Sequence, residues 1–440
     1  MFRYLIIILS SLLELRVSIA LNLNKNKIPI KKNPSLNIRM LNNNNQYSSI
    51  DLSVIKSDFG LYSIDIYIGE PGQKFSLIID SGSSILWVYD KKCNSCKSKN
   101  KFVTSNSKTF ISNKENIDLF YVSGTFKGEL CQDNMNFNNK YNLPLFYFLL
   151  IYESNVEFEI DGIIGFSKGS YYRQTYSFLN QLYEKKIIKE NLYIYDFFNK
   201  LFFIGEVPSY LNNEKKISCH DENENSNFWM CETNFVKFEN VPIFMNTKII
   251  FDSGTNGIVF PLIYLDIFRK IILKNDIFVK YQCNFLNASD DNIYKFACIN
   301  DIDINDIKNI NHNIIDFNFN KIIKNDTNNS FGFKLMDLID EDIQTFSLYI
   351  FDRKDDIILG SPFFEKYPVM FNKDNNTITI FGEGHDLNRN ITSYKKIIIK
   401  IIIIIIIIII IILLLIILRN CIFSKRRINN ESIEILPMEE

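Results

Sequence analysis

An internal repeat restricts the fold of this chain more than any other feature of its sequence. One apolar run ends in Asp80-Ser81-Gly82-Ser83, and a second ends in Asp252-Ser253-Gly254-Thr255. Each is followed at a distance by two apolar residues and a glycine, at Ile163-Ile164-Gly165 and at Ile358-Leu359-Gly360. Because these elements recur in the same order, we predict two related lobes with an internal pseudo-twofold repeat.

Length and composition agree with two lobes. The chain has 440 residues, more than one core usually fills, and its hydrophobic content of 47% excludes a fully disordered protein. We place the lobes at residues 58–206 and 207–385. The stretch Asn300–Ser330 is rich in Asn, Asp and Ile and is interpreted as a loop inserted in the second lobe.

The body of the chain is predicted to be mostly β. Tyr62–Ile68 alternates in part, Glu70-Pro71-Gly72 supplies a turn, and Phe75–Ile79 is another short apolar run. Helical periodicity is scarce outside stretches such as Ser177–Ile188.

The repeated aspartates suggest acid–base chemistry. If the lobes face each other, Asp80 and Asp252 converge, and two carboxylates this close share one proton. One can then activate a water molecule while its protonated partner hydrogen-bonds a substrate carbonyl. Gly82 and Gly254 allow a sharp bend and close approach of the backbone. Ser83 and Thr255 are each expected to donate a hydrogen bond to the neighbouring aspartate.

Other chemistries are disfavoured. The three histidines, His220, His312 and His385, are scattered, whereas a triad needs an imidazole base and a zinc site needs closely spaced ligands. A zinc site at Cys93 and Cys96 is a weak alternative, because no second such pair exists. The net charge of −1 argues against nucleic-acid binding. We expect no metal, no cofactor and no nucleic acid partner.

Taken together, these motifs resemble those of the pepsin-like aspartic proteases. The segment Asp80–Val88, which includes Trp87, looks like the first catalytic segment of the family, and Leu359–Phe364 looks like its closing segment. Phe120–Gly128 is similar to the mobile flap hairpin. The resemblance implies an all-β, two-lobed pepsin-like fold, with Asp80 and Asp252 catalytic. It also implies that Tyr121, Gly124, Thr125 and Trp87 serve the flap and the substrate.

The resemblance extends upstream, and it has departures. Ile28–Lys32 is similar to family pro-segments, whose lysines cover the dyad in the zymogen, and residues 21–57 are interpreted as a pro-segment or flexible segment. Ser81 and Ser253 stand where the family usually has threonine; the hydroxyl is retained, so hydrogen bonds across the lobes can form. The Asn/Lys/Ile-rich background suggests a plasmepsin-type member from an apicomplexan parasite.

Eight cysteines fit an oxidising compartment better than a cytosol. The candidate disulfides are Cys93–Cys96 and Cys283–Cys298, and two of Cys131, Cys219 and Cys231 could also pair. Cys421 is expected to lie outside the disulfide set.

The two ends of the chain predict membrane targeting. Residues 1–20 are typical of a cleaved signal peptide, with a signal anchor as the alternative. Ile401–Leu418 is an unbroken run of isoleucine and leucine, and a helix of this length measures about 27 Å, close to a bilayer core. The alternative is low-complexity drift. We therefore expect a transmembrane helix at 397–418 and a cytoplasmic tail at 419–440.

The sequence favours a membrane-anchored aspartic endopeptidase that cleaves peptide or protein substrates by a two-aspartate, activated-water mechanism. We expect a monomeric, single-pass type I protein of the secretory or endomembrane system, with its body lumenal or extracellular. The alternative is a catalytically inactive homologue that acts as a lumenal binding module.

Overall fold

The computed structural model describes residues 49–387, except for 58–59, 99, 122–123, 138–140, 157–158, 170–175, 222–225, 290–292, 301, 311, 320–329, 340–344, 353–355 and 386. The predicted signal peptide, the run 397–418 and the tail 419–440 lie outside these residues. No helix within the described part of the chain is long and apolar enough to cross a membrane.

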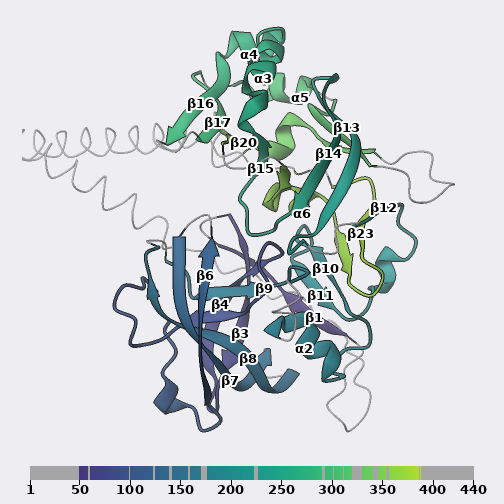
Figure 1. Ribbon diagram of the computed structural model, residues 1–440. Helices are drawn as coiled ribbons and strands as arrows, with labels where there is room; N and C mark the ends of the chain where they lie inside the picture. The colour runs from purple at the N-terminus through teal and green to yellow at the C-terminus, as the bar shows by residue number, and fades with distance from the viewer. Residues whose placement is uncertain are drawn as a thin grey trace, which may run out of the picture. The chain divides into compact units, whose positions relative to one another are not determined.

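The first half of the chain forms an eight-stranded sheet in the order β2-β3-β4-β9-β5-β8-β7-β6, in which β3 also pairs with β7 (Figure 1). Its strands are β2 (Ile55–Lys56), β3 (Tyr62–Ile68), β4 (Gln73–Asp80), β5 (Trp87–Tyr89), β6 (Ile111–Tyr121), β7 (Gly124–Phe137), β8 (Tyr141–Ser154) and β9 (Gly162–Gly165). β7 contributes to two apolar clusters: Phe126 and Leu130 pack in one, and Cys131, Met135 and Phe137 pack in the other.

The second half forms a nine-stranded sheet in the order β16-β17-β20-β15-β21-β14-β13-β18-β19. Its strands are β13 (Met230–Phe238), β14 (Val241–Phe251), β15 (Ile258–Pro261), β16 (Cys283–Ser289), β17 (Ile293–Cys298), β18 (Ile315–Phe319), β19 (Ser330–Phe333), β20 (Thr345–Phe351) and β21 (Ile357–Leu359). A mostly β body is therefore confirmed, and the arrangement fits the two-lobed pepsin-like fold.

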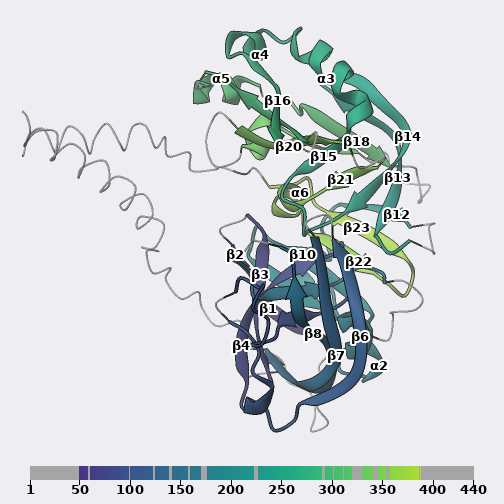
Figure 2. The same ribbon diagram turned by 60° about the vertical axis from the view of Figure 1, so that its left-hand side comes forward.

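A third, six-stranded sheet draws strands from both halves, and Figure 2 shows β10 near β22, with which it pairs. It contains, in order, β1 (Ile50–Ser53), β11 (Leu201–Ile204), β10 (Leu192–Asp196), β22 (Val369–Asn372), β23 (Thr377–Phe381) and β12 (Lys216–His220). The central pair β10 and β22 is antiparallel, with Tyr193 opposite Phe371. This sheet ties the two halves of the sequence together.

Helices in the described part of the chain are few and short. They are α2 (Phe178–Glu184), α3 (Leu265–Ile272), α4 (Asp276–Lys280), α5 (Ile304–Asn309) and α6 (Ser361–Lys366), with 3-10 turns η1 (Thr104–Asn106), η3 (Ser209–Leu211), η4 (Leu262–Tyr264) and η5 (Leu335–Leu338). The helix expected near Ser177–Ile188 is present as α2, which begins after Ser177.

The structure corrects two expectations. The segment 21–57 is predicted to be a pro-segment or a flexible segment, but its last residues are not flexible: they form β1 and β2, and Ile50, Leu52 and Val54 are buried in the core. The stretch Asn300–Ser330 is predicted to be a loop, but it contains α5 and β18. The strand β18 lies between β13 and β19 in the sheet, and its residues Ile315, Phe317 and Phe319 are buried.

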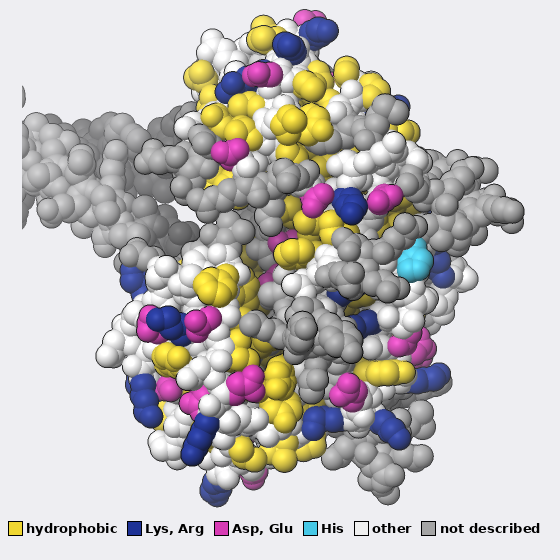
Figure 3. Space-filling view, in the orientation of Figure 1, with side chains coloured by type: hydrophobic (Ala, Val, Ile, Leu, Met, Phe, Trp, Pro, Cys, Tyr) yellow, Lys and Arg dark blue, Asp and Glu magenta, His cyan; other side chains and the backbone are white. Residues whose placement is uncertain are grey.

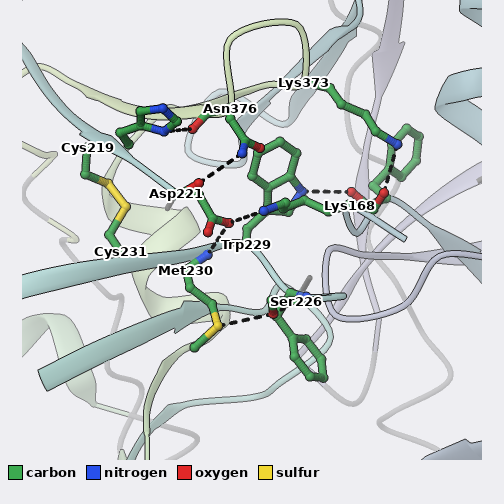
Figure 4. A network of polar contacts seen from close by, with 12 residues as sticks. Lys168, Cys219, Asp221, Ser226, Trp229, Met230, Cys231, Lys373 and Asn376 are labelled. Atoms are coloured by element: carbon green, nitrogen blue, oxygen red, sulfur yellow. Dashed lines mark hydrogen bonds and ion pairs between the residues drawn. A yellow bond between two sulfur atoms is a disulfide. The ribbon is translucent and has the colours of Figure 1, made fainter. Parts of the chain in front are cut away.

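A buried polar network joins the segment after β9 to the strands β12 and β13 (Figure 4). Lys168 Nζ lies 3.0 Å from Asp221 Oδ2, and both side chains are almost fully buried. The same carboxylate oxygen accepts a hydrogen bond from the Met230 amide, while Trp229 Nε1 donates to the Phe166 carbonyl oxygen. Buried charges need such partners, because an unpaired one costs several kcal/mol.

Three disulfides are formed among the described cysteines. Cys93–Cys96 and Cys283–Cys298 are bonded as predicted, and the third bond joins Cys219 to Cys231. Cys131 is a buried free thiol. The disulfide at Cys93 and Cys96 contradicts the zinc alternative, since bonded sulfur atoms are not thiolate ligands.

Candidate active site

Each repeated aspartate lies at the end of a strand that runs parallel to the later element of its own repeat. Asp80 ends β4 and lies opposite Gly165 of β9. Asp252 follows β14, which is parallel to β21. In both halves a third strand, β5 or β15, pairs antiparallel with that later element. The sequence repeat is therefore also a repeat of strand topology.

The two aspartates face each other, and two glycines leave the necessary space. A Cβ atom added to Gly82 would lie 2.5 Å from Asp252 Oδ1, and one added to Gly254 would lie 2.5 Å from Asp80 Oδ1. Real Cβ atoms do not approach oxygen this closely. Each aspartate thus lies against the glycine that follows the other aspartate by two residues.

Crossed hydrogen bonds from Ser81 and Ser253 join the two turns. The Ser81 hydroxyl donates to the Phe251 carbonyl oxygen at 2.9 Å, and the Ser253 hydroxyl donates to the Ile79 carbonyl oxygen at 2.8 Å. Each serine amide also donates to the other serine's Oγ, at 3.0 and 2.9 Å. Both side chains are fully buried. The hydroxyl retained at these positions is therefore used on both sides.

The carboxylates receive further hydrogen bonds from their own turns. The amides of Gly82 and Gly254 donate to Oδ1 of Asp80 and Asp252, at 2.8 and 2.9 Å. Thr255 Oγ1 donates to Asp252 Oδ2 at 2.8 Å, as predicted.

The matching hydrogen bond predicted for Ser83 is not formed with regular geometry. Its buried Oγ has no hydrogen-bond partner among the described residues. The Ser83 side chain nevertheless lies close enough to Asp80 to favour the ionised form of the Asp80 carboxyl group. Asp252 thus has a hydroxyl donor in good geometry, whereas Asp80 does not.

The environment of Asp80 disfavours its ionised form. Burial raises the pKa of Asp80 well above its usual range, and the charge of Asp252 raises it further. The nearby Ser83 hydroxyl and the Gly82 amide, which donates to Asp80 Oδ1, lower the pKa of Asp80 and oppose this shift only in part. One proton is therefore held at the pair well above the pH at which an ordinary aspartate ionises.

The predicted flap is an antiparallel hairpin of β6 and β7, with Tyr121 opposite Gly124. Trp87 Nε1 donates a hydrogen bond to the Tyr121 hydroxyl oxygen at 3.1 Å. The Tyr121 ring also packs edge-on against Phe126, with the centroids 5.3 Å apart. The Thr125 amide donates to Asn155 Oδ1 at 2.8 Å. The structure thus brings Trp87 and Tyr121 together and anchors the second strand of the hairpin.

Sequence reasoning missed Tyr195, which lies in β10 with its hydroxyl oxygen 3.2 Å from Ser253 Oγ. The alternation of aromatic residues in Leu192–Asp196 indicated a buried strand, but nothing local indicated a contact with a serine far away in the sequence.

Acidic and basic side chains are interspersed among apolar ones on the face drawn in Figure 3. Within the part of the chain that the structure describes, no group of three or more His, Cys, Asp and Glu side chains is placed to hold a metal ion.

Comparison with known proteins places these features in a family. The family model described as "Eukaryotic aspartyl protease" matches residues 61–381, which contain both aspartates and the hairpin. Vacuolar protease A of Aspergillus fumigatus is 26% identical over 261 residues, which cover 54% of this chain and 64% of that protein. Cathepsin D of Gallus gallus is 29% identical over 141 residues, covering 30% and 35%. Plasmepsin I of Plasmodium falciparum is 37% identical over 81 residues, covering 18% of each.

The chain spans less than two thirds of the length of these curated relatives. They include fungal, animal and Plasmodium proteins at low identity, so they do not single out the plasmepsin type. The family model, in contrast, matches well over half of the chain and includes both repeated motifs. The chain belongs to the eukaryotic aspartyl protease family of pepsin-like proteins.

Proposed function

We propose that this protein is an aspartic endopeptidase that hydrolyses peptide bonds of protein substrates. The observation that carries the proposal is the convergence of Asp80 and Asp252 on each other's turns, with burial and mutual repulsion retaining one proton at the pair. A pair with one carboxylate and one carboxylic acid can act as base and acid in the same step.

The environments of the two residues assign their roles. Asp252, whose carboxylate accepts hydrogen bonds from Gly254 and Thr255, takes a proton from a water molecule as that water attacks the peptide carbonyl carbon. Asp80 gives its proton to the carbonyl oxygen, which forms a neutral tetrahedral intermediate. Asp252 then passes its proton to the amide nitrogen while Asp80 takes a proton back from a hydroxyl group of the intermediate, so that the C–N bond breaks to give a carboxylic acid and an amine. The crossed serines keep both carboxyl groups in position during these transfers.

The hairpin of β6 and β7 supplies the cover over the substrate. Tyr121, held by Trp87, closes over bound peptide, so that water is excluded from the reacting bond. Gly124 and Thr125 lie opposite Tyr121 and Phe120, the last two residues of β6, and so begin the returning strand of the hairpin.

We further propose that the enzyme is a type I membrane protein with a lumenal body and a removable pro-segment. The apolar run Ile401–Leu418 and the disulfides support this location, since disulfides persist in oxidising compartments. Because Ile50–Ser53 pairs with β11, the removable part ends before Ile50. A plasmepsin-type member is supported by the Asn/Lys/Ile-rich composition.

The test of the mechanism is turnover of one peptide across pH by the wild type, Asp80→Asn, Asp252→Asn and the double variant. Residues that act as one unit are non-additive, so each single variant is expected to be nearly as inactive as the double variant. The wild type should lose activity at both pH extremes, because only the singly protonated pair is competent. Substantial turnover by either single variant would refute the two-aspartate mechanism.

The second candidate is a catalytically inactive homologue that binds peptides in the lumen. The buried Ser83 hydroxyl, which makes no regular hydrogen bond to Asp80, is the observation that favours it. A wild type that binds peptides but does not cleave them at any pH would establish this alternative.

A further inference from the structure

Tyr195 lies beneath the candidate dyad. Its strand, β10, belongs to the six-stranded sheet, and its ring is fully buried. The ring packs against Phe364, Phe197 and Phe202, with centroids 4.9, 5.0 and 5.1 Å away. Its hydroxyl is the group that reaches the crossed serines, 3.2 Å from Ser253 Oγ.

Counting protons shows which oxygen donates. A serine hydroxyl has one proton and two lone pairs. Ser253 Oγ donates its proton to the Ile79 carbonyl oxygen at 2.8 Å and accepts a hydrogen bond from the Ser81 amide at 3.0 Å. The remaining lone pair is therefore the acceptor for Tyr195. Burial raises the pKa of Tyr195 well above its usual value, so the donor keeps its proton.

Packing alone does not require this hydroxyl. Phe371 lies on β22, the strand that pairs with β10, and its ring centroid is 6.1 Å from that of Phe251, the residue before Asp252. This phenyl ring fills its part of the same core without a polar atom. A hydroxyl group is thus not needed to fill this core, and the hydroxyl of Tyr195 instead contacts Ser253.

We propose that Tyr195 is a positioning residue of the dyad, which acts by holding Ser253 in the one orientation that binds the peptide groups on both sides of Asp80. This inference rests on the proposed peptidase function and deepens it. Serine is not β-branched, so its χ1 angle is less restricted than that of threonine. A third hydrogen bond supplies the missing restriction. Without it, the turn that carries Asp80 is held less firmly against Asp252.

The expected consequence is a narrower pH profile. The separation of the two apparent pKa values of a coupled pair depends on how closely the carboxyl groups are held. Tyr195→Phe removes only the hydroxyl, so the separation should shrink and both limbs of the kcat profile should move inward. Loss of one such hydrogen bond is expected to lower kcat by up to about tenfold, with KM little changed.

Tyr193→Phe is the matched control. Tyr193 lies two residues away on the same strand and is equally buried, but its hydroxyl donates to the Phe166 carbonyl oxygen at 2.6 Å and not to a serine. The full-length chain is assayed in detergent as wild type, Tyr195→Phe and Tyr193→Phe, with kcat and KM measured across pH. Tyr193→Phe should keep the width of the wild-type profile. The inference is overturned if Tyr195→Phe keeps that width too, or if both variants narrow it equally.

A second measurement separates this inference from the proposed function. The 13C signal of the Asp80 carboxyl group, assigned with Asp80→Asn, can be titrated in the wild type and in both tyrosine variants without any turnover. The inference expects a lower apparent pKa in Tyr195→Phe alone, and an unchanged titration overturns it. A wild type that cleaves no peptide refutes the proposed function and leaves this titration to decide the role of Tyr195.

Discussion

Replacing Gly82 with alanine tests whether the carboxyl groups must lie where the structure places them. The new Cβ atom would lie 2.5 Å from Asp252 Oδ1 and 2.7 Å from its Cγ. A carbon–oxygen contact normally needs about 3.4 Å, so the Asp252 carboxylate must move by about 0.9 Å. Gly82 does not have a positive φ angle, so alanine is acceptable for the backbone and the perturbation is purely steric.

A displacement of about 1 Å in catalytic geometry costs about 100-fold in rate. We therefore expect Gly82→Ala to lower kcat/KM about 100-fold, or about 2.7 kcal/mol. Overpacking should also destabilise the fold by about 1–3 kcal/mol. Gly254→Ala should behave alike, because its Cβ atom would lie 2.5 Å from Asp80 Oδ1.

The assay is steady-state cleavage of one peptide, with thermal unfolding of each variant measured in parallel. Gly72→Ala is the control, since Gly72 lies in an exposed turn where the added Cβ atom would lie 3.0 Å from Tyr67 Cβ. That variant should retain most of its activity. A folded Gly82→Ala protein with wild-type kcat/KM would show that the two turns do not face each other as described.

Three further predictions concern the Asp80 carboxyl group, the flap hairpin and the apolar run Ile401–Leu418. Because the pKa of Asp80 is raised, the folded state holds this proton more tightly than the unfolded state does. The free energy of unfolding should therefore fall as pH rises above about 4 towards the folded-state pKa of Asp80. Denaturant unfolding across pH should show this slope, and Asp80→Asn should abolish it. Tyr121→Phe removes the acceptor for Trp87 Nε1, so kcat/KM should fall by roughly tenfold while the unfolding midpoint changes little; unchanged kinetics would mean that this bond does not position the flap. Truncation after Tyr394 should release a soluble, secreted protein, and extraction of the full-length chain by alkaline carbonate would contradict the proposed span.

The sequence by itself singled out the two candidate catalytic residues and predicted the class of fold. Asp80 and Asp252 could be singled out because the apolar run, the turn and the later Ile-Ile-Gly or Ile-Leu-Gly element recur in the same order. Strands and turns are encoded locally by alternation and by glycine, and short cysteine spacings limit the possible partners. For these reasons the mostly β body and the bonds Cys93–Cys96 and Cys283–Cys298 could be predicted.

Only the tertiary structure decided how distant side chains meet. The crossed bonds of Ser81 and Ser253, the contact of Gly82 with Asp252 and the hydroxyl of Tyr195 depend on segments that are far apart in the sequence. The difference between Ser83 and Thr255 is of the same kind, because both have a hydroxyl in the same sequence position and only Thr255 reaches its aspartate in good geometry. A local pattern specifies a turn, but the distances between turns are set by the packing of whole sheets.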